Sequence, residues 1–221
     1  MRQFDRMSRC CIRTRIDDKN KTYTEKFAIG DVDCMTEAIF GWSTHPNLNI
    51  YMSHAIFRKN LPGWSTGEEE DVLAVLSLVG DLDFDLGKKA VGIDRLPLPA
   101  TYVVETSAGN FHATFSLGRA LPPSDAKAIA IALSNAIGGD SGTKDISHLW
   151  RIPGTLNWPT KTKLARNRPA TPQLVTVKRA WNGDTIEPEA LWEAVKDFAA
   201  ATRSSPVPIA RPRLPRHCRR G

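Results

Sequence analysis

Short apolar segments separated by polar turns run along the chain, and two hydrophobic periodicities alternate among them. Apolar residues at every second position predict strands, and spacings of three and four predict amphipathic helices. We predict strands at residues 9–15, 22–27, 47–53, 75–84, 101–107, 110–117 and 174–181. We predict helices at residues 31–41, between Ser124 and Gly138, and at 188–200, and a helix of about two turns that begins at Thr66. This interleaving, with at least one hairpin, predicts an α+β or mixed α/β domain.

The predicted helices carry recognisable end signals. Thr66 and Glu69 have the spacing of a capping box, and Ser124 is placed to be an N-cap. Gly138 predicts the end of that helix, because glycine tolerates the left-handed backbone of a helix C-terminus. The apolar stripe of the helix predicts its core-facing side: Ala126, Ile129, Ala130, Leu133 and Ile137.

Residues 101–107 and 110–117 flank a tight turn and predict a β-hairpin. In its second strand the apolar face is Phe111, Ala113, Phe115 and Leu117, and the polar face is Asn110, His112, Thr114 and Ser116. His112 on this open face could donate to a phosphate oxygen, and Ser107 could add a hydroxyl. A surface histidine without a ligand is the alternative. We interpret the other histidines as structural or exposed: His45, His54, His148 and His217.

The apolar strand at 75–84 runs into Gly80-Asp-Leu-Asp-Phe-Asp85. The carboxylates at 81, 83 and 85 are predicted to lie on one side of the strand, while Leu82 and Phe84 point into the core. Carboxylates at this spacing can bridge a pair of hard cations such as Mg²⁺. Like charges on one face would repel each other without a counter-charge, which favours a metal over a solvated strand end.

Two other metal-binding motifs are excluded. An EF-hand loop fails because Leu86 stands at its sixth position and Gly92 at its twelfth. The cysteines form no Cys-x-x-Cys pair and have no histidine at zinc-finger spacing, so no structural zinc is expected. We interpret them as reduced thiols of a cytoplasmic protein: Cys10, Cys11, Cys34 and Cys218.

A third segment, residues 139–157, combines carboxylates with an arginine. Asp140 and Asp145 precede Arg151, and a Pro-Gly turn follows directly after the arginine. Arginine suits bidentate phosphate binding. Further basic residues either extend this phosphate-binding character or form a solvated loop: Lys161, Lys163, Arg166 and Arg168. Core packing is favoured over base stacking for the two tryptophans of this region, Trp150 and Trp158.

The net charge of +6 is concentrated at one end of the chain. Residues 203–221 hold six of the 30 basic residues and no acid, and the remaining 24 basic residues equal the 24 acidic ones. We therefore predict a folded domain over residues 1–202 and a Pro/Arg-rich tail or linker over 203–221. No run of 18 or more apolar residues occurs, so we expect no membrane association.

These motifs together resemble the archaeo-eukaryotic primase (AEP) superfamily, and more narrowly the RepB-like primase-polymerase domains of plasmids and phages. The resemblance covers residues 45–170, with the core motifs within 75–160. The matching residues are Asp81 and Asp83, then Ser107 and His112, then Arg151-Ile-Pro-Gly-Thr-Leu-Asn-Trp-Pro159. By spacing, Asp140 matches the third metal ligand of the family, and Asp145 matches a supporting acid that often follows it.

The resemblance implies an AEP primase fold, in which an RRM-like palm with a mixed or antiparallel sheet joins a small N-terminal αβ unit. It implies two Mg²⁺ or Mn²⁺ ions held by Asp81, Asp83 and Asp140. It implies that the incoming triphosphate is bound by Ser107, His112, Arg151, Lys161 and Lys163. Asp145, Asn110 and Asn157 are candidate supporting residues.

The implied function is a DNA primase or primase-polymerase that makes primers on single-stranded DNA for plasmid or phage replication. The implied partners are the DNA template, NTPs or dNTPs, and a replicative helicase in cis or in trans. The alternative is a non-catalytic module that binds nucleic acid and nucleotide as a replication initiator or helicase-associated domain. A rolling-circle initiator is excluded, because the chain has no His-x-His and its three tyrosines fall in predicted strands.

Overall fold

The computed structural model describes residues 9–16, 21–62, 65–85, 88–139, 141–165 and 168–204. The described strands are β1 (Arg9–Ile16), β2 (Lys21–Ala28), β3 (Leu48–Ser53), β4 (Ala55–Phe57), β5 (Val72–Leu82), β6 (Tyr102–Ser107), β7 (Asn110–Leu121), β8 (Leu149–Arg151), β9 (Leu156–Asn157), β10 (Gln173–Leu174) and β11 (Thr176–Arg179). The described helices are α1 (Val32–Ser43), α2 (Pro123–Ile137), α3 (Lys161–Leu164) and α4 (Pro188–Ser204). Single 3₁₀ turns lie at Glu69–Asp71, Ile93–Arg95 and Ser141–Thr143.

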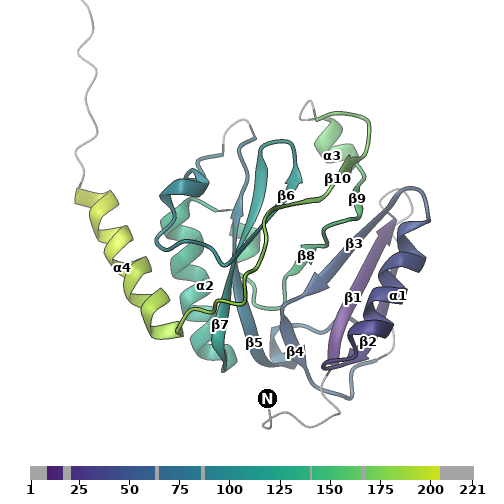
Figure 1. The fold of residues 1–221 in the computed structure, drawn as a ribbon, viewed down its shortest axis with the longest axis horizontal. Coiled ribbons are helices and arrows are strands. Elements are labelled where there is room, and N and C mark those ends of the chain that lie inside the picture. The colour runs from purple at the N-terminus through teal and green to yellow at the C-terminus, as the bar shows by residue number, and fades with distance from the viewer. Residues whose placement is uncertain are drawn as a thin grey trace, which may run out of the picture.

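One large sheet connects the two parts of the fold (Figure 1). Its strand order is β11-β6-β7-β5-β4-β1-β3-β8, with β2 paired to β1, and the named strand pairs are antiparallel. At one end, β1, β2 and β3 with α1 form a small αβ unit (Figure 1). At the other end, β5, β6, β7 and β11 form a palm that carries α2 and α4. This arrangement confirms the predicted α+β class.

The main core lies between the palm sheet and α2. Leu82 of β5 and Phe115 of β7 are fully buried on this side. The predicted stripe of α2 packs against them, with Ala130 partly buried and the rest buried: Ala126, Ile129, Leu133 and Ile137. Gly138 ends the helix in the left-handed conformation, and a Cβ there would overlap the carbonyl oxygen of Lys89. One face of the palm is therefore apolar and covered, which leaves the other face for polar side chains.

A smaller core joins the N-terminal unit to the third sequence segment. Phe27 of β2 and Ile50 of β3 pack with Ile152, which follows directly after β8. The backbone of β8 also pairs with β3, with Tyr51 opposite Arg151. The segment that contains the Pro-Gly turn is therefore anchored to the N-terminal unit.

The helix predicted at Thr66 is wrong. Only the 3₁₀ turn Glu69–Asp71 forms, because β5 begins at Val72, three residues before the predicted start of that strand. The capping box of this turn uses Glu68 and Asp71, and the Glu68 N–H donates to Asp71 Oδ2 at 2.9 Å.

Two predicted element ends are also wrong. Ser124 is not an N-cap, because α2 begins at Pro123, whose fixed φ suits the first position of a helix. Phe84 does not point into the core, because β5 ends at Leu82 and the Phe84 side chain beyond it is 45% exposed.

The C-terminal elements differ from the prediction in their extent. The strand predicted at 174–181 is divided into β10 and β11 at Val175, which is buried and whose N–H donates to the Thr155 carbonyl at 2.9 Å. Helix α4 continues to Ser204, and residues 205–221 of the predicted tail lie outside the described residues. Among the described residues, no helix combines the length and apolar character needed to cross a bilayer.

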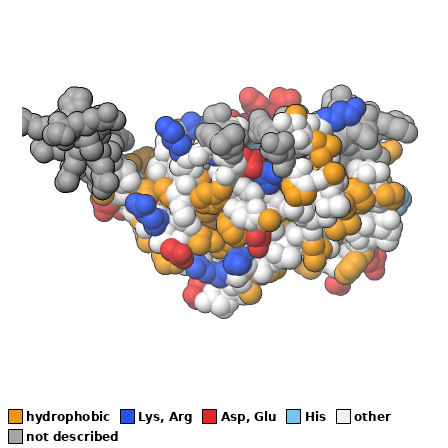
Figure 2. Space-filling view, turned by 90° about the horizontal axis from the view of Figure 1, so that it is seen from above, with side chains coloured by type: hydrophobic (Ala, Val, Ile, Leu, Met, Phe, Trp, Pro, Cys, Tyr) orange, Lys and Arg blue, Asp and Glu red, His pale blue; other side chains and the backbone are white. Residues whose placement is uncertain are grey.

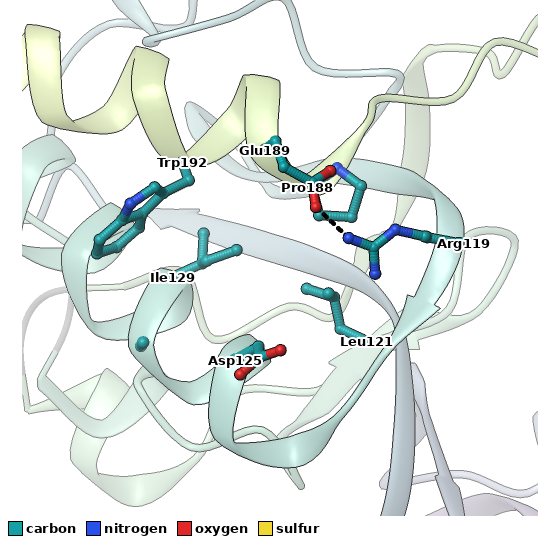
Figure 3. Close-up of a pocket in the computed structure, with 8 residues that line it drawn as sticks. Arg119, Leu121, Asp125, Ile129, Pro188, Glu189 and Trp192 are labelled. Atoms are coloured by element: carbon teal, nitrogen blue, oxygen red, sulfur yellow. Dashed lines mark hydrogen bonds and ion pairs between the residues drawn. The ribbon is translucent and has the colours of Figure 1, made fainter.

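The surface of the palm carries a pocket of about 250 Å³ between α2 and the start of α4 (Figure 3). Ile129 and Trp192 line it, and the ion pair of Arg119 with Glu189 lies at its side (Figure 3). None of the predicted site residues lines this pocket. Figure 2 shows acidic and basic side chains interspersed over the face seen from above.

Candidate active site

Asp81 of β5 and His112 of β7 are directly paired across two antiparallel strands. The Nε2 atom of His112 lies 3.8 Å from Asp81 Oδ1. The neighbours of Asp81 face α2, because a Cβ on Gly80 would lie 2.6 Å from Ile137 Cδ1 and Leu82 is fully buried. Side chains alternate along a strand, so Asp81 and His112 project from the opposite face of the palm. Strand register therefore brings two of the predicted motifs together.

His112 is not on an open face as predicted, because its side chain is only 13% exposed. The Trp150 ring of β8 meets it edge to face, with centroids 5.0 Å apart and planes at 82°. Burial lowers the pKa of His112 well below its ordinary value, and the charges of Arg151 and His148 lower it further. The imidazole is therefore neutral at pH 7. Its buried Nδ1 has no hydrogen-bond partner among the described residues.

Trp150 lies among three histidine rings. Besides His112, it contacts His148 at 4.5 Å and His54 at 6.5 Å between ring centroids. His54 Nδ1 is hydrogen-bonded to Ser77 Oγ at 2.8 Å, and burial lowers the pKa of His54 to about 4. Trp150 is buried, as predicted for core packing. No spacing in the sequence indicates this cluster, because His54, His112 and the neighbouring pair His148 and Trp150 come from three separate segments.

Asp83 and Asp85 lie just beyond the end of β5, and both contact the guanidinium of Arg168. Arg168 Nη2 lies 3.0 Å from Asp83 Oδ1 and 2.6 Å from Asp85 Oδ2. Arg168 Nη1 donates to Ser107 Oγ at the hairpin. The sequence marks Arg168 only as one member of a basic loop, because local spacing cannot connect it to distant carboxylates. We call the contacts of Arg168 with Asp83, Asp85 and Ser107 the arginine bridge.

Asn110 fixes the acidic segment against the hairpin. Its Oδ1 accepts the Phe84 N–H at 2.8 Å. Its Nδ2 donates to Ser107 Oγ at 3.2 Å and to the Ala108 carbonyl at 3.3 Å. The position of the carboxylates beyond β5 therefore depends on a side chain from β7.

Lys163 of α3 is partly buried near the same carboxylates. Burial lowers the pKa of Lys163 to about 8. Four charged groups act on this pKa, two guanidiniums that lower it and two carboxylates that raise it: Arg151, Arg168, Asp83 and Asp81. Lys161, which is also predicted to bind the nucleotide, is exposed on the same short helix. Of the two lysines, Lys163 is thus the one that shares the electrostatic environment of the carboxylates.

Arg151 of β8 is buried and held by the N-terminal unit. Its Nη1 donates to Asn49 Oδ1 at 2.7 Å, and its guanidinium lies over the Tyr51 ring at 4.9 Å from the centroid. Asn49 Oδ1 also accepts the Trp158 N–H at 2.9 Å. Asn49 and Tyr51 sit on a predicted strand without any motif, so the sequence offers no signal for their role in orienting the arginine.

Asn157 and Asp145 make contacts that order their own segments. Asn157 Nδ2 donates to the Thr106 carbonyl at 2.6 Å, which links β9 to β6. Asp145 Oδ1 accepts the N–H and Oγ–H of Ser147, both at 2.8 Å. Burial raises the pKa of Asp145, but the hydrogen bonds with Ser147 and Glu69 outweigh burial and leave the pKa below its ordinary value.

Asp140, the predicted third metal ligand, lies outside the described residues. Within the described ranges, no group of three or more His, Cys, Asp or Glu side chains is placed to hold a metal ion. The donor chemistry of Asp81 and Asp83 nevertheless fits Mg²⁺ or Mn²⁺, which prefer carboxylate oxygens. The described residues thus supply two of the three predicted carboxylates.

The model of one protein family, described as the RepB DNA-primase N-terminal domain, matches residues 86–197, just over half of the chain. The chain belongs to this family. The match to the RepB primase family includes Ser107, His112 and Arg168, and it begins after Asp81 and Asp83. Membership supports the predicted DNA-primase function, and primases of this kind generally use divalent metals.

Solved structures share the fold of this RepB-family chain. The AEP domain of the primase-polymerase of cyanophage S-2L is 14% identical, with a TM-score of 0.57 over 86% of this chain and 90% of that one. Primase RepB′ is 17% identical, with a TM-score of 0.57 over 88% of this chain and 59% of that one. The catalytic domain of RepB′ in complex with initiator DNA is 17% identical, with a TM-score of 0.55 over 89% and 90%. No curated protein matches the chain. The predicted AEP primase fold is confirmed.

Proposed function

We propose that this domain is a primase-polymerase that joins nucleotides on a single-stranded DNA template by metal-dependent nucleotidyl transfer. The junction of the motifs carries the proposal: Asp81 is paired with His112, and Asp83 is linked to Ser107 through Arg168. Carboxylates next to cationic and hydroxyl groups suit a metal–triphosphate complex. The carboxylates can bind the metal ions, and the cations and the hydroxyl can bind the phosphate oxygens. Membership of the RepB primase family supports the same reaction class.

Asp81 and Asp83, together with Asp140, would hold the metals. Two Mg²⁺ or Mn²⁺ ions bound there would promote attack by a 3′-hydroxyl and neutralise charge on the departing pyrophosphate. Asp81 and Asp83 are both partly buried, which excludes much of the competing water from their oxygens. Asn110 keeps the segment that holds Asp83 in place through the Phe84 N–H.

The triphosphate of the incoming nucleotide would be bound by Arg151, Lys163, Ser107 and His112, with Lys161 at the exposed side. Arg151 is oriented by Asn49 and Tyr51 before any ligand arrives, which reduces the entropy lost on binding. His112 is neutral, so its ring carries one N–H that can donate to a phosphate oxygen. The Trp150 ring packs against the imidazole in a T-shaped contact, and the His112 side chain is only 13% exposed.

Single-stranded DNA and NTPs or dNTPs are the proposed partners. The complex of the RepB′ catalytic domain with initiator DNA supports DNA binding by this fold. The chain spans 59% of RepB′. A replicative helicase in cis or in trans, which the family resemblance implies, is a further proposed partner. For the predicted tail, residues 203–221, the proposed role is that of a linker or a phosphate-binding segment.

The deciding experiment is primer synthesis on unprimed single-stranded DNA with labelled NTPs or dNTPs and Mg²⁺ or Mn²⁺. Wild type should give product, and the Asp81→Asn/Asp83→Asn double variant should give none while it retains most DNA binding. Asp184→Asn, in an exposed turn, is the matched control and should keep wild-type synthesis. DNA binding without product from wild type would contradict the proposal and support the non-catalytic binding module.

The third metal ligand is tested by comparing Asp140→Asn with Asp145→Asn. We expect Asp140→Asn to cost more synthesis, because Asp145 already uses one oxygen to accept two hydrogen bonds from Ser147. A larger loss from Asp145→Asn, at unchanged stability, would reassign the third ligand.

A further inference from the structure

One nitrogen of the Arg168 guanidinium, Nε, is buried and makes no hydrogen bond within the described part of the chain. The Nη groups of Arg168 serve Asp83, Asp85 and Ser107 in the arginine bridge, and the side chain is only 14% exposed. A buried donor without an acceptor is unfavourable, because it has lost its hydrogen bond to water and gained none in return. The orphaned Nε–H therefore indicates a ligand that brings an acceptor oxygen.

The arginine bridge also occupies Asp83, which is expected to bind a metal ion. Asp83 Oδ1 accepts from Arg168 Nη2 at 3.0 Å and from the Asp85 N–H at 3.3 Å. A guanidinium and a divalent cation on one carboxylate repel each other in a partly buried site. Asp85, by contrast, makes the shorter contact with Arg168, at 2.6 Å, and suits the role of its permanent anchor.

A third observation is the gathering of three cations at and beside the bridge. Arg151 and Arg168 both lie close enough to Lys163 for their charges to lower the pKa of its ammonium. The three cations equal in number the three nearby carboxylates, Asp81, Asp83 and Asp85, so a bound divalent metal would leave this region with a net positive charge. A polyanion is the ligand class that such a cluster attracts.

We propose that Arg168 is a nucleotide-binding residue that serves as the counter-ion of Asp83 and Asp85 until the nucleotide triphosphate arrives. It then exchanges its contact with Asp83 for a phosphate oxygen and keeps Asp85 as its anchor. Arg168 thus opposes a divalent cation at Asp83 when no nucleotide is present, and supports triphosphate binding when it is. This inference rests on the proposed function of the site.

The proposed exchange predicts that replacing Arg168 changes the affinities for metal and for nucleotide in opposite directions. In Arg168→Gln, the affinity for Mn²⁺ without nucleotide, measured from the free-ion signal in electron paramagnetic resonance, should rise by roughly tenfold. The affinity of the same variant for an α,β-imido triphosphate analogue with Mg²⁺ should fall by roughly tenfold or more. Arg168→Lys keeps the charge but loses the planar fork, so both effects should be smaller.

The matched control is Arg58→Gln, which removes an arginine from a surface ion pair with Asp71 at 2.6 Å. Both affinities of this control should equal those of wild type. If Arg168→Gln lowers the affinities for Mn²⁺ and for the nucleotide analogue together, or changes neither, Arg168 only stabilises the structure and the proposed exchange is wrong. If Asp83→Asn binds Mn²⁺ as tightly as wild type does, the proposed metal site is wrong, and this inference is overturned with it.

A measurement on the wild-type protein keeps the test valid if Arg168→Gln does not fold. The Nε–H resonance of Arg168, assigned by its absence in Arg168→Lys, should shift downfield when the analogue and Mg²⁺ are added, because the proton gains an acceptor. An unchanged resonance at saturating analogue would overturn the proposal.

Discussion

Asp81 and His112 face each other because β5 and β7 pair in one antiparallel register, with the histidine Nε2 3.8 Å from the carboxylate. A slip of one residue would turn one of the two side chains towards α2, since side chains alternate between the faces of a sheet. The buried Leu82 and Phe115 oppose such a slip, because it would expose apolar side chains to the polar face. The packing of the back face therefore holds the site on the front face in alignment.

Replacing Asn110 should uncouple the acidic segment from the hairpin. Asn110→Ala leaves the Phe84 N–H without its acceptor, so we expect the free energy of unfolding to fall by about 1–3 kcal/mol. Primer synthesis should fall at temperatures where the variant is still folded, because Asp83 loses its positioning. Chemical denaturation and synthesis assays measure the two effects. Asn182→Ala, in an exposed turn, is the control, and equal losses in both variants would refute this role of Asn110.

Nucleotide affinity should depend on the protonation of Lys163. The ammonium is fully charged well below its pKa of about 8 and is lost as pH rises through that value. Binding of the triphosphate analogue should therefore weaken above about pH 8, by up to about tenfold per pH unit. Lys163→Arg stays charged and should remove this part of the pH dependence. Identical pH profiles for wild type and Lys163→Arg would rule out Lys163 as the titrating group.

Gly138 should tolerate a methyl group poorly, because its φ of 69° is left-handed and a Cβ would overlap the Lys89 carbonyl. We expect Gly138→Ala to lower the free energy of unfolding by about 2–4 kcal/mol. Gly183→Ala tests the backbone strain alone, since Gly183 has a φ of 97° and open space around it. This control should lose about 1 kcal/mol. Thermal or urea unfolding of both variants decides whether the overlap adds to the strain.

His54 should make stability fall in mild acid. Its folded-state pKa of about 4 lies below the ordinary 6.5, so the unfolded chain binds the proton first. The free energy of unfolding should decrease as pH falls from about 6.5 to about 4, with a slope of up to about 1.4 kcal/mol per pH unit from this residue. His54→Gln can keep a hydrogen bond to Ser77 without titrating. The slope for this variant in urea unfolding should be smaller than that for wild type by up to about 1.4 kcal/mol per pH unit, and equal slopes would rule out His54 as the titrating group.

The elements that the sequence predicted well are those whose cause is local. The core positions Ala113, Phe115 and Leu117 of β7 and the stripe of α2 were predicted from the spacing of apolar residues alone. Gly138 ends α2 because the left-handed conformation is a property of that single residue. The order of acidic strand, hairpin and Arg-Ile-Pro-Gly segment likewise identified the family to which the chain belongs.

The errors arose where distant parts of the chain compete. Phe84 lies outside the core because β5 ends where its pairing with β7 ends, at Leu82 opposite Phe111. The helix at Thr66 is absent because β5 extends back to Val72 and takes up the residues that the helix would need. The ends of β5 are set by the strands it pairs with, so they cannot be predicted from the local propensity of its own residues.

The sequence by itself determined which residue types could carry the chemistry, because carboxylates, histidine and arginine act through their own functional groups. Only the tertiary structure decided which of them meet. Arg168 joins Asp83 to Ser107, and Asn49 orients Arg151. It also decided that His112 is buried and neutral, because residues of other segments, Trp150 of β8 among them, pack against it. Charge state and contact depend on burial by distant segments, and that burial exists only once the sheet has formed.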